Sequence, residues 1–239
     1  MDNFSYYNIF ETKGIEYIAI IIFFIILIPF WIILNKKTVI KQTFQKAMRI
    51  FSFDILKIPK GVFLGKNHTW VFLEKSGAAA VGLDDFLIHS IGEVKLNNIK
   101  FSGEMIRKGE LLTEIVKDNK SLKIFSPISG EVIMTNSQLN ENPDLLNEDP
   151  FGKAWIYKIK PTKWIEETRT YYLAEDAINW SKMEMQRFKD FLAISNKTFL
   201  SESSLAILQD GGELLDNTLS DLSTDVWHDF QEKFLNLKE

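Results

Sequence analysis

Short runs that alternate apolar and polar residues follow one another over residues 58–165, separated by glycines and polar turns. A turn signal every eight to twelve residues or so is typical of a small all-β barrel or sandwich. Gly103, Gly109 and Gly130 fall at joints between runs, where a positive φ or a close backbone approach is expected. The sequence therefore predicts a mainly β domain. Its expected strands lie in GVFL, HTWVFLEKS, AAAVGL, GEVKLN, MIRKGELLTEIV, SLKIFSP, GEVIMTN and AWIYKIKP.

Two segments inside this β pattern carry helical signals. LDDFLIHSIG begins with Asp84 and Asp85, and acidic residues are favoured in the first turn of a helix. NENPDLLNEDP is predicted to begin at Asn142 as N-cap, with Pro143 at the first helical position and Pro150 after its end. The adjacent carboxylates at the first helix have no partner base in the sequence, so an acid–base role for them is disfavoured.

An uncharged apolar run of eighteen residues covers Tyr17–Leu34. As a helix it is long enough to cross a hydrocarbon core of about 30 Å. We predict a transmembrane helix at 15–35, after a short extracytoplasmic N-terminus at 1–14. The basic residues that follow favour the cytoplasmic side, so the expected protein is a single-pass protein of the cytoplasmic (inner) membrane, with its N-terminus out and its bulk in the cytoplasm. These basic residues are Lys36, Lys37, Lys41, Lys46 and Arg49.

Residues 36–57 continue with the apolar residues Ile40, Phe44, Met48 and Phe51 at helical spacing, and with basic residues between them. This pattern predicts a basic amphipathic helix, which would lie along the anionic inner leaflet. The alternative is a helix that packs on the following domain.

Composition excludes several classes of site. The chain has no cysteine, which removes disulfides, thiolate metal sites and cysteine nucleophiles. His68, His89 and His228 are scattered without metal-ligand spacing, so no metal is expected. The net charge of −4 does not indicate a nucleic-acid surface. Phosphate loops and nucleophile elbows are absent from the sequence, and we do not expect this chain to be an enzyme.

The segments NHTWVFLEKSGAAAVGLDDF at 67–86 and GEVIMTNSQLNENPDLLNEDPFGKAWIYKIKP at 130–161 resemble the H protein of the glycine cleavage system, a relative of lipoyl domains. The resemblance implies a barrel-sandwich hybrid that carries lipoate on one hairpin lysine. In that family the lipoyl arm takes an aminomethyl group from glycine decarboxylase to an aminomethyltransferase, and a dihydrolipoyl dehydrogenase reoxidises it.

The resemblance also locates the residue that should carry the arm. The family's lysine would fall eight residues before Pro127 and ten residues after Gly109, and both counts arrive at Asn119. Val116 and Lys123 replace acidic residues of the family's modification segment. An asparagine amide is neutral and hardly nucleophilic, so no lipoyl amide is expected at this position.

Lys120 and Lys117 are the candidate substitutes, and lipoate is expected as a cofactor only if one of them is used. Lys120 lies one residue late, and a shift of one residue in a hairpin turns the side chain to the other face. Solvated turn lysines are the default interpretation of both.

After the β domain the sequence predicts a helical C-terminal extension at 166–239. One helix fits LAEDAINWSKMEMQRFKDFLAIS and a second fits DVWHDFQEKFLN, each with apolar residues clustered on one face. These faces either pack back on the β domain or dock a protein partner. Docking is the favoured expectation, because the β domain resembles one that is complete without them.

The leading hypothesis is a membrane-anchored H-protein-like chain that has lost lipoylation and acts as a structural or interaction subunit of a membrane-associated complex, for which the resemblance leaves a redox role open. A scaffold gains effective concentration from an anchor, whereas a shuttling carrier gains from free diffusion. The alternative is an active lipoyl carrier that uses Lys120, in one-carbon or sulfur chemistry. A third hypothesis is a binder or chaperone of lipoyl-handling enzymes.

Overall fold

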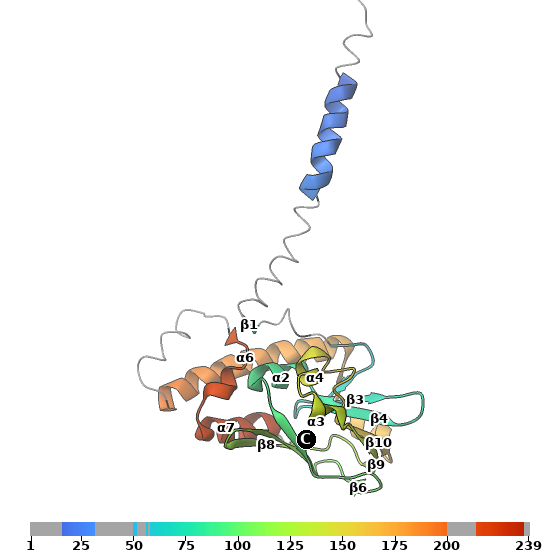
Figure 1. Ribbon diagram of the computed structural model, residues 1–239, viewed down its shortest axis with the longest axis vertical. Helices are drawn as coiled ribbons and strands as arrows, with labels where there is room; N and C mark the ends of the chain where they lie inside the picture. The colour runs from blue at the N-terminus through green and yellow to red at the C-terminus, as the bar shows by residue number, and fades with distance from the viewer. Residues whose placement is uncertain (1–15, 32–49, 52–55, 57, 200–213, 237–239) are drawn as a thin grey trace, which may run out of the picture. The chain divides into compact units, whose positions relative to one another are not determined.

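The computed structural model describes residues 16–31, 50–51, 56, 58–199 and 214–236 (Figure 1). The chain divides into two compact units, Met1–Met48 and Arg49–Glu239.

In the first unit, residues 16–31 form a helix whose side chains are all exposed. Across the described ranges, no helix combines the length and the apolar character needed to cross a bilayer. The predicted transmembrane helix is therefore unsupported, and the predicted location in the cytoplasmic membrane is wrong. The flanking residues 15 and 32–35 of the predicted span lie outside the described residues.

Most of the predicted amphipathic segment, 36–57, also lies outside the described residues. Ile50 and Phe51 are described and form a strand, so the helical prediction is wrong at these two positions. Phe51 is fully buried in the second unit, where a strand pairing fixes its backbone.

The second unit is mainly β, as predicted, with helices added between and after the strands. Its strands are β1 (Ile50–Phe51), β2 (Phe63–Leu64), β3 (Thr69–Leu73), β4 (Ala79–Leu83), β5 (Lys95–Asn98), β6 (Met105–Ile106), β7 (Leu111–Lys117), β8 (Lys120–Phe125), β9 (Gly130–Thr135), β10 (Tyr157–Pro161), β11 (Tyr172–Leu173) and β12 (Leu214–Leu215). Its helices are α2 (Asp85–Ile91), α3 (Gln138–Glu141), α4 (Leu145–Glu148), α5 (Trp164–Thr168), α6 (Ala174–Phe199), η3 (Thr218–Asp221), α7 (Thr224–Phe230) and the π-helical turn η4 (Gln231–Leu235).

Three antiparallel sheets are formed by these strands. A seven-stranded sheet has the order β11-β2-β3-β4-β10-β9-β6, and a three-stranded sheet has the order β5-β7-β8. The third sheet pairs β1 with β12 and so joins the start of the unit to its C-terminal part. β7 and β8 form the hairpin that the sequence singled out, and β8 is an edge strand of its sheet.

The glycines at the joints have the two roles that were predicted for them. Gly103 and Gly109 have φ values of 91° and 80°, which side chains adopt at a cost. Gly130 is needed for close approach instead, because a Cβ there would lie 2.2 Å from the carbonyl oxygen of Lys160 on β10. The first residue of β9 can therefore lie this close to β10 only if it is glycine.

The helix α2 confirms the predicted acidic start. Asp84 is its N-cap, and its Oδ1 accepts a hydrogen bond of 2.9 Å from the backbone N–H of Leu87. The second insert differs from its prediction: α4 begins at Leu145 after Asp144, and Asn142 is not its cap. Asn142 instead ends α3, where its N–H donates to the carbonyl of Gln138.

The C-terminal extension packs onto the β domain rather than presenting its aromatic faces to solvent. Figure 1 draws α7 beside β8, and these two elements are in contact. Burial of one large apolar side chain stabilises a fold by about 1.5–3 kcal/mol relative to exposure. The packing of the extension therefore contributes substantially to the stability of the second unit. The expected docking by these faces is therefore wrong. The buried side chains are Phe188, Phe191, Val226, Trp227, Phe230, Phe234 and Leu235.

Candidate functional site

The tip of the β7–β8 hairpin is a two-residue turn. Lys117 and Lys120 are cross-strand partners, and Asp118 and Asn119 connect them. Asp118 has a φ of 51° and so takes the left-handed position of the turn, which Asp and Asn tolerate better than most residues. Asn119 is exposed at the tip.

Both candidate lysines lie on the inner face of the hairpin. Side chains on a strand alternate between faces, so Lys117 shares its face with the fully buried Ile115, and Lys120 shares its face with the fully buried Leu122. Each lysine is half-buried, with its stem along the sheet and its ammonium group at protein oxygen atoms.

The ammonium group of Lys120 is bound by the C-terminal extension. Its Nζ donates to the carbonyl oxygen of Ser220 at 2.6 Å and to that of Leu222 at 2.9 Å. It also lies 5.3 Å from the centroid of the Trp227 ring, within range of a cation–π interaction. On the other strand, Lys117 Nζ donates to the carbonyl oxygen of Ile91 at 3.2 Å. Lys120 thus joins the hairpin to a segment about a hundred residues later.

The edge of β8 is covered by a side chain of the same extension. Gln231 Oε1 accepts a hydrogen bond of 2.7 Å from the N–H of Lys123, and Gln231 Nε2 donates to the carbonyl of Lys123 at 3.1 Å. This side-chain amide reproduces the pair of bonds that a neighbouring strand would make. It satisfies one residue of an edge that would otherwise be open to pairing.

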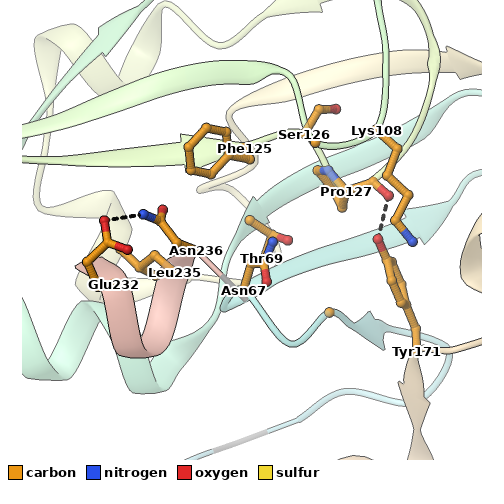
Figure 2. Close-up of a pocket in the computed structure, with 12 residues that line it drawn as sticks. Asn67, Thr69, Lys108, Phe125, Ser126, Pro127, Tyr171, Glu232, Leu235 and Asn236 are labelled. Carbon is orange, nitrogen blue, oxygen red and sulfur yellow. Dashed lines mark hydrogen bonds between the residues drawn. The ribbon is translucent and has the colours of Figure 1, made fainter. Parts of the chain in front are cut away.

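The turn that follows β8 is held by a network around α5. Glu167 accepts from the N–H of Ser129 at 2.7 Å and from its hydroxyl at 2.5 Å. Lys108 Nζ donates to the carbonyl of Glu167 at 3.1 Å and lies 4.7 Å from the ring centroid of Tyr171. The Tyr171 hydroxyl donates to the carbonyl of Pro127 (Figure 2). The network fixes the base of the hairpin.

A pocket of about 640 Å³ opens beside this network (Figure 2). Its walls come from four separate parts of the second unit. These are the β2–β3 turn, the base of the β7–β8 hairpin where β7 begins and β8 ends, Tyr171, and η4 with the residue that follows it. Lys108 contributes a cation to one wall and Glu232 a carboxylate to another, while Phe125 and Leu235 contribute apolar surface. The pocket thus combines an apolar lining with both signs of charge.

Next to the pocket, His68 forms a buried ionic cluster between the β domain and α6. Its Nδ1 lies 2.8 Å from Asp84 Oδ2, and its Nε2 lies 3.7 Å from Glu184 Oε2. Burial by itself lowers the pKa of His68, but the charge and hydrogen bond of Asp84, aided by Glu184, raise the pKa from 6.5 to about 9. His68 is therefore a cation at neutral pH, and its full burial fits a structural role.

His89 makes the corresponding link from α2 to the segment after β12. Its Nδ1 lies 2.8 Å from Asp216 Oδ1, its Nε2 lies 3.3 Å from Asp85 Oδ1, and its ring stacks on Phe51. Burial lowers the pKa of His89, but hydrogen bonds to Asp216 and Asp85 outweigh this and raise the pKa to about 9. The carboxylate pair at the start of α2 thus serves as cap and ion-pair partner.

The structure brings Asn119, Lys117 and Lys120 to one hairpin tip. Sequence reasoning missed the pocket residues Asn67 and Lys108, because nothing in the order of residues indicates that they meet the extension. No group of three or more metal-binding side chains was found within the described parts of the chain.

The family model and the similar proteins all indicate the same family. The family model described as glycine cleavage H-protein matches residues 63–184, about half of the chain. The probable glycine cleavage system H protein of Pyrococcus abyssi is 34% identical over 119 residues, which are 50% of this chain and 88% of that protein. The glycine cleavage system H protein of Thermus thermophilus is 31% identical over 106 residues, which are 44% of this chain and 82% of that protein.

Among solved structures, the crystal structure of a glycine cleavage system H protein from Mycobacterium marinum matches with a TM-score of 0.46 and 20% identity, covering 52% of this chain and 99% of that chain. The matched segment of the family model contains the whole hairpin and ends inside α6, so most of the extension lies beyond it. On the evidence of the family model and these relatives, the chain belongs to the glycine cleavage H-protein family.

Proposed function

We propose that this chain is an H-protein family member that carries no lipoyl group and acts as a non-catalytic interaction subunit of a protein assembly. One observation supports the proposal most: Asn119 occupies the hairpin tip, while the ammonium group of Lys120 is bound to two backbone carbonyls of the extension. The exposed tip residue thus lacks an amine, and the nearest amine is engaged within the chain.

Lipoylation of Lys120 would carry a chemical cost. Conversion of the ammonium to a neutral amide would remove its charge and leave at most one N–H for two carbonyl acceptors. The arm would also have to leave the inner face of the hairpin, where the Lys120 side chain is half-buried between β8 and the extension. These contacts favour the unmodified chain over the alternative of a carrier that uses Lys120.

The relatives are named as components of a glycine cleavage system, and we propose that this chain keeps contact with proteins of that kind. Without an arm, such contact would deliver no aminomethyl group. The chain would then hold its partner proteins in position or stabilise their assembly, which is the role of a scaffold.

Co-expression of the full chain with a lipoate ligase tests the absence of lipoylation. We expect the unsubstituted chain to keep its unmodified mass, and the variant Asn119→Lys to gain the mass of one lipoyl group. This variant is the positive control, because it restores an amine at the tip and leaves the contacts of Lys120 in place. Lipoylation of the unsubstituted chain, lost in Lys120→Arg, would establish the carrier function instead.

A further inference from the structure

One short segment of the extension contacts both β1 and the tip of the β7–β8 hairpin. This segment, Leu214–Leu222, runs from β12 through η3, and we call it the strap. At its start β12 pairs with β1. At its end the carbonyls of Ser220 and Leu222 accept hydrogen bonds from Lys120 Nζ. The strap thus connects the beginning of the second unit to the hairpin tip.

The middle of the strap is held by His89 on α2. His89 Nδ1 lies 2.8 Å from Asp216 Oδ1, and the backbone N–H of Asn217 donates to the carbonyl of His89 at 2.7 Å. The strap lies so close to the end of α2 that a Cβ on Gly92 would be 2.5 Å from Asn217 Cγ. The ring of Phe51, from β1, stacks on the His89 ring with the centroids 5.5 Å apart. β1 therefore supports the strap twice, through β12 and through His89.

Polar and backbone contacts hold most of the strap. Leu214 and Leu219 are its buried side chains, whereas its other side chains are exposed or half-buried. Segments with few buried apolar contacts open locally at a lower free energy than the fold as a whole. The strap is therefore a segment that can leave the β domain while the sheets stay folded.

The closed strap covers the amine of Lys120. Lys120 Nζ donates to two carbonyls of the strap, and the Trp227 ring lies 5.3 Å away. An acylating reagent reacts with a lysine nitrogen only when the nitrogen is free to attack it. Opening of the strap removes both carbonyls and leaves Lys120 as a free amine at the tip. Lys117 differs, because its Nζ donates to the carbonyl of Ile91 on α2 and not to the strap.

We propose that the strap is a conformational cover that closes over Lys120, and that β1 controls how often it opens. The pairing of β1 with β12 and the contact of Phe51 with His89 favour the closed state, because they hold the same segment that binds Lys120. Loosening of β1 therefore frees Lys120, and loss of the amine loosens β1, since coupling between two sites is reciprocal. The inference goes beyond the proposed function, because it concerns an equilibrium within the chain rather than a partner.

Competitive labelling of amines on the full-length chain tests the proposal. A trace amount of acetic anhydride acetylates the accessible lysines, and peptide mass spectrometry gives the rate at Lys120 relative to Lys117. Phe51→Leu removes the ring that stacks on His89, and Asp216→Ala removes the carboxylate that His89 contacts. We expect each variant to raise the rate at Lys120 about tenfold and to leave the rate at Lys117 unchanged.

Two controls separate opening of the strap from general unfolding. Lys158 lies 2.8 Å from Glu74 in an ion pair on the seven-stranded sheet, so its labelling reports loss of that sheet. Asp225→Ala removes an exposed aspartate of α7 and should label as the unsubstituted chain does. An unchanged rate at Lys120 in both test variants would overturn the proposal. Equal acceleration at Lys120, Lys117 and Lys158 would overturn it as well, because it would show general unfolding.

The reverse effect gives an independent measurement. Lys120→Met leaves the residues of β1 unchanged, and we expect hydrogen exchange of the peptide that contains Ile50 and Phe51 to become about tenfold faster in this variant. Lys117→Met is the matched control and should leave exchange at β1 unaltered, since Lys117 donates to Ile91. The same exchange rate at β1 in Lys120→Met and in the unsubstituted chain would contradict the coupling.

Discussion

Lys120 at the tip of the hairpin donates its ammonium hydrogens to the carbonyl of Ser220 at 2.6 Å, across a hundred residues of sequence. A lysine that could have served as a substitute attachment point is instead part of the contact between the β domain and the extension.

This contact predicts the effect of removing the amine. Lys120→Met retains the stem and loses two hydrogen bonds to a charged donor, so we expect the free energy of unfolding to fall by about 1–3 kcal/mol. Denaturant unfolding measures the change, and hydrogen exchange should become faster around η3. Lys123→Met is the control, because the Lys123 side chain is exposed and its bonds to Gln231 come from the backbone. Equal stability of the two variants would contradict the assigned role of Lys120.

The amide of Gln231 should protect the edge of β8. Gln231→Leu removes both bonds to the backbone of Lys123, and we expect a loss of about 1–3 kcal/mol in the free energy of unfolding. The amide hydrogen of Lys123 should also exchange with solvent faster, because β8 opens locally more easily once the bonds to Gln231 are lost. Gln186→Leu, at an exposed position of α6, should change neither quantity. An unchanged exchange rate at Lys123 in Gln231→Leu would show that the edge bond is not significant.

The two buried histidines predict a dependence of stability on pH. Both have a pKa raised from 6.5 to about 9 in the folded chain. Their contribution is fully present below pH 6.5 and is lost as the pH rises to 9, because the folded state must hold protons that the unfolded chain has released. We expect the free energy of unfolding to fall over this interval, by on the order of 3 kcal/mol for each histidine.

His89→Gln isolates one of these contributions. The variant should be less stable than the unsubstituted chain at pH 6 and should show a shallower decline between pH 6.5 and 9. His228→Gln, at an exposed position of α7, should retain the full decline. Parallel curves for His89→Gln and the unsubstituted chain would exclude the ionic link between His89 and Asp216.

The close approach at Gly130 predicts a steric effect. Gly130→Ala places a Cβ 2.2 Å from the carbonyl oxygen of Lys160, so β9 and β10 must separate locally. Overpacking of this kind costs about 1–3 kcal/mol, which thermal unfolding will detect. Gly77→Ala is a comparison with no atom within 4 Å of the new Cβ, although φ is +85° there. A smaller loss of stability in Gly130→Ala than in Gly77→Ala would contradict the close approach of β9 to β10 at Gly130.

The sequence predicted the strands well because one feature, period-two alternation bounded by glycines, determines them locally. The hairpin is the best example: its two runs, its turn at Asp118 and Asn119, and its glycine joints are all present. The cap at Asn142 was wrong because a short helix upstream ends at that residue, and a capping motif does not indicate which of two adjacent turns it serves.

The role of the extension could not be predicted for a different reason. Periodicity identifies an apolar face on a helix but not the surface that the face contacts. The aromatic residues of α6 and η4 meet the β domain, and His89 meets Asp216 at a separation of 127 residues. The pocket could not be predicted for the same reason, since Asn67 and Asn236 come together only through the fold.

The most direct test of the central claim is the intact mass of the full-length protein purified from its native cell, followed by peptide mapping over β7 and β8. The proposed function predicts that the Asp118–Lys120 turn and both flanking lysines carry no lipoyl group. The mass of one lipoyl group on a peptide that contains Lys120 or Lys117 would contradict it and would identify the chain as an active carrier.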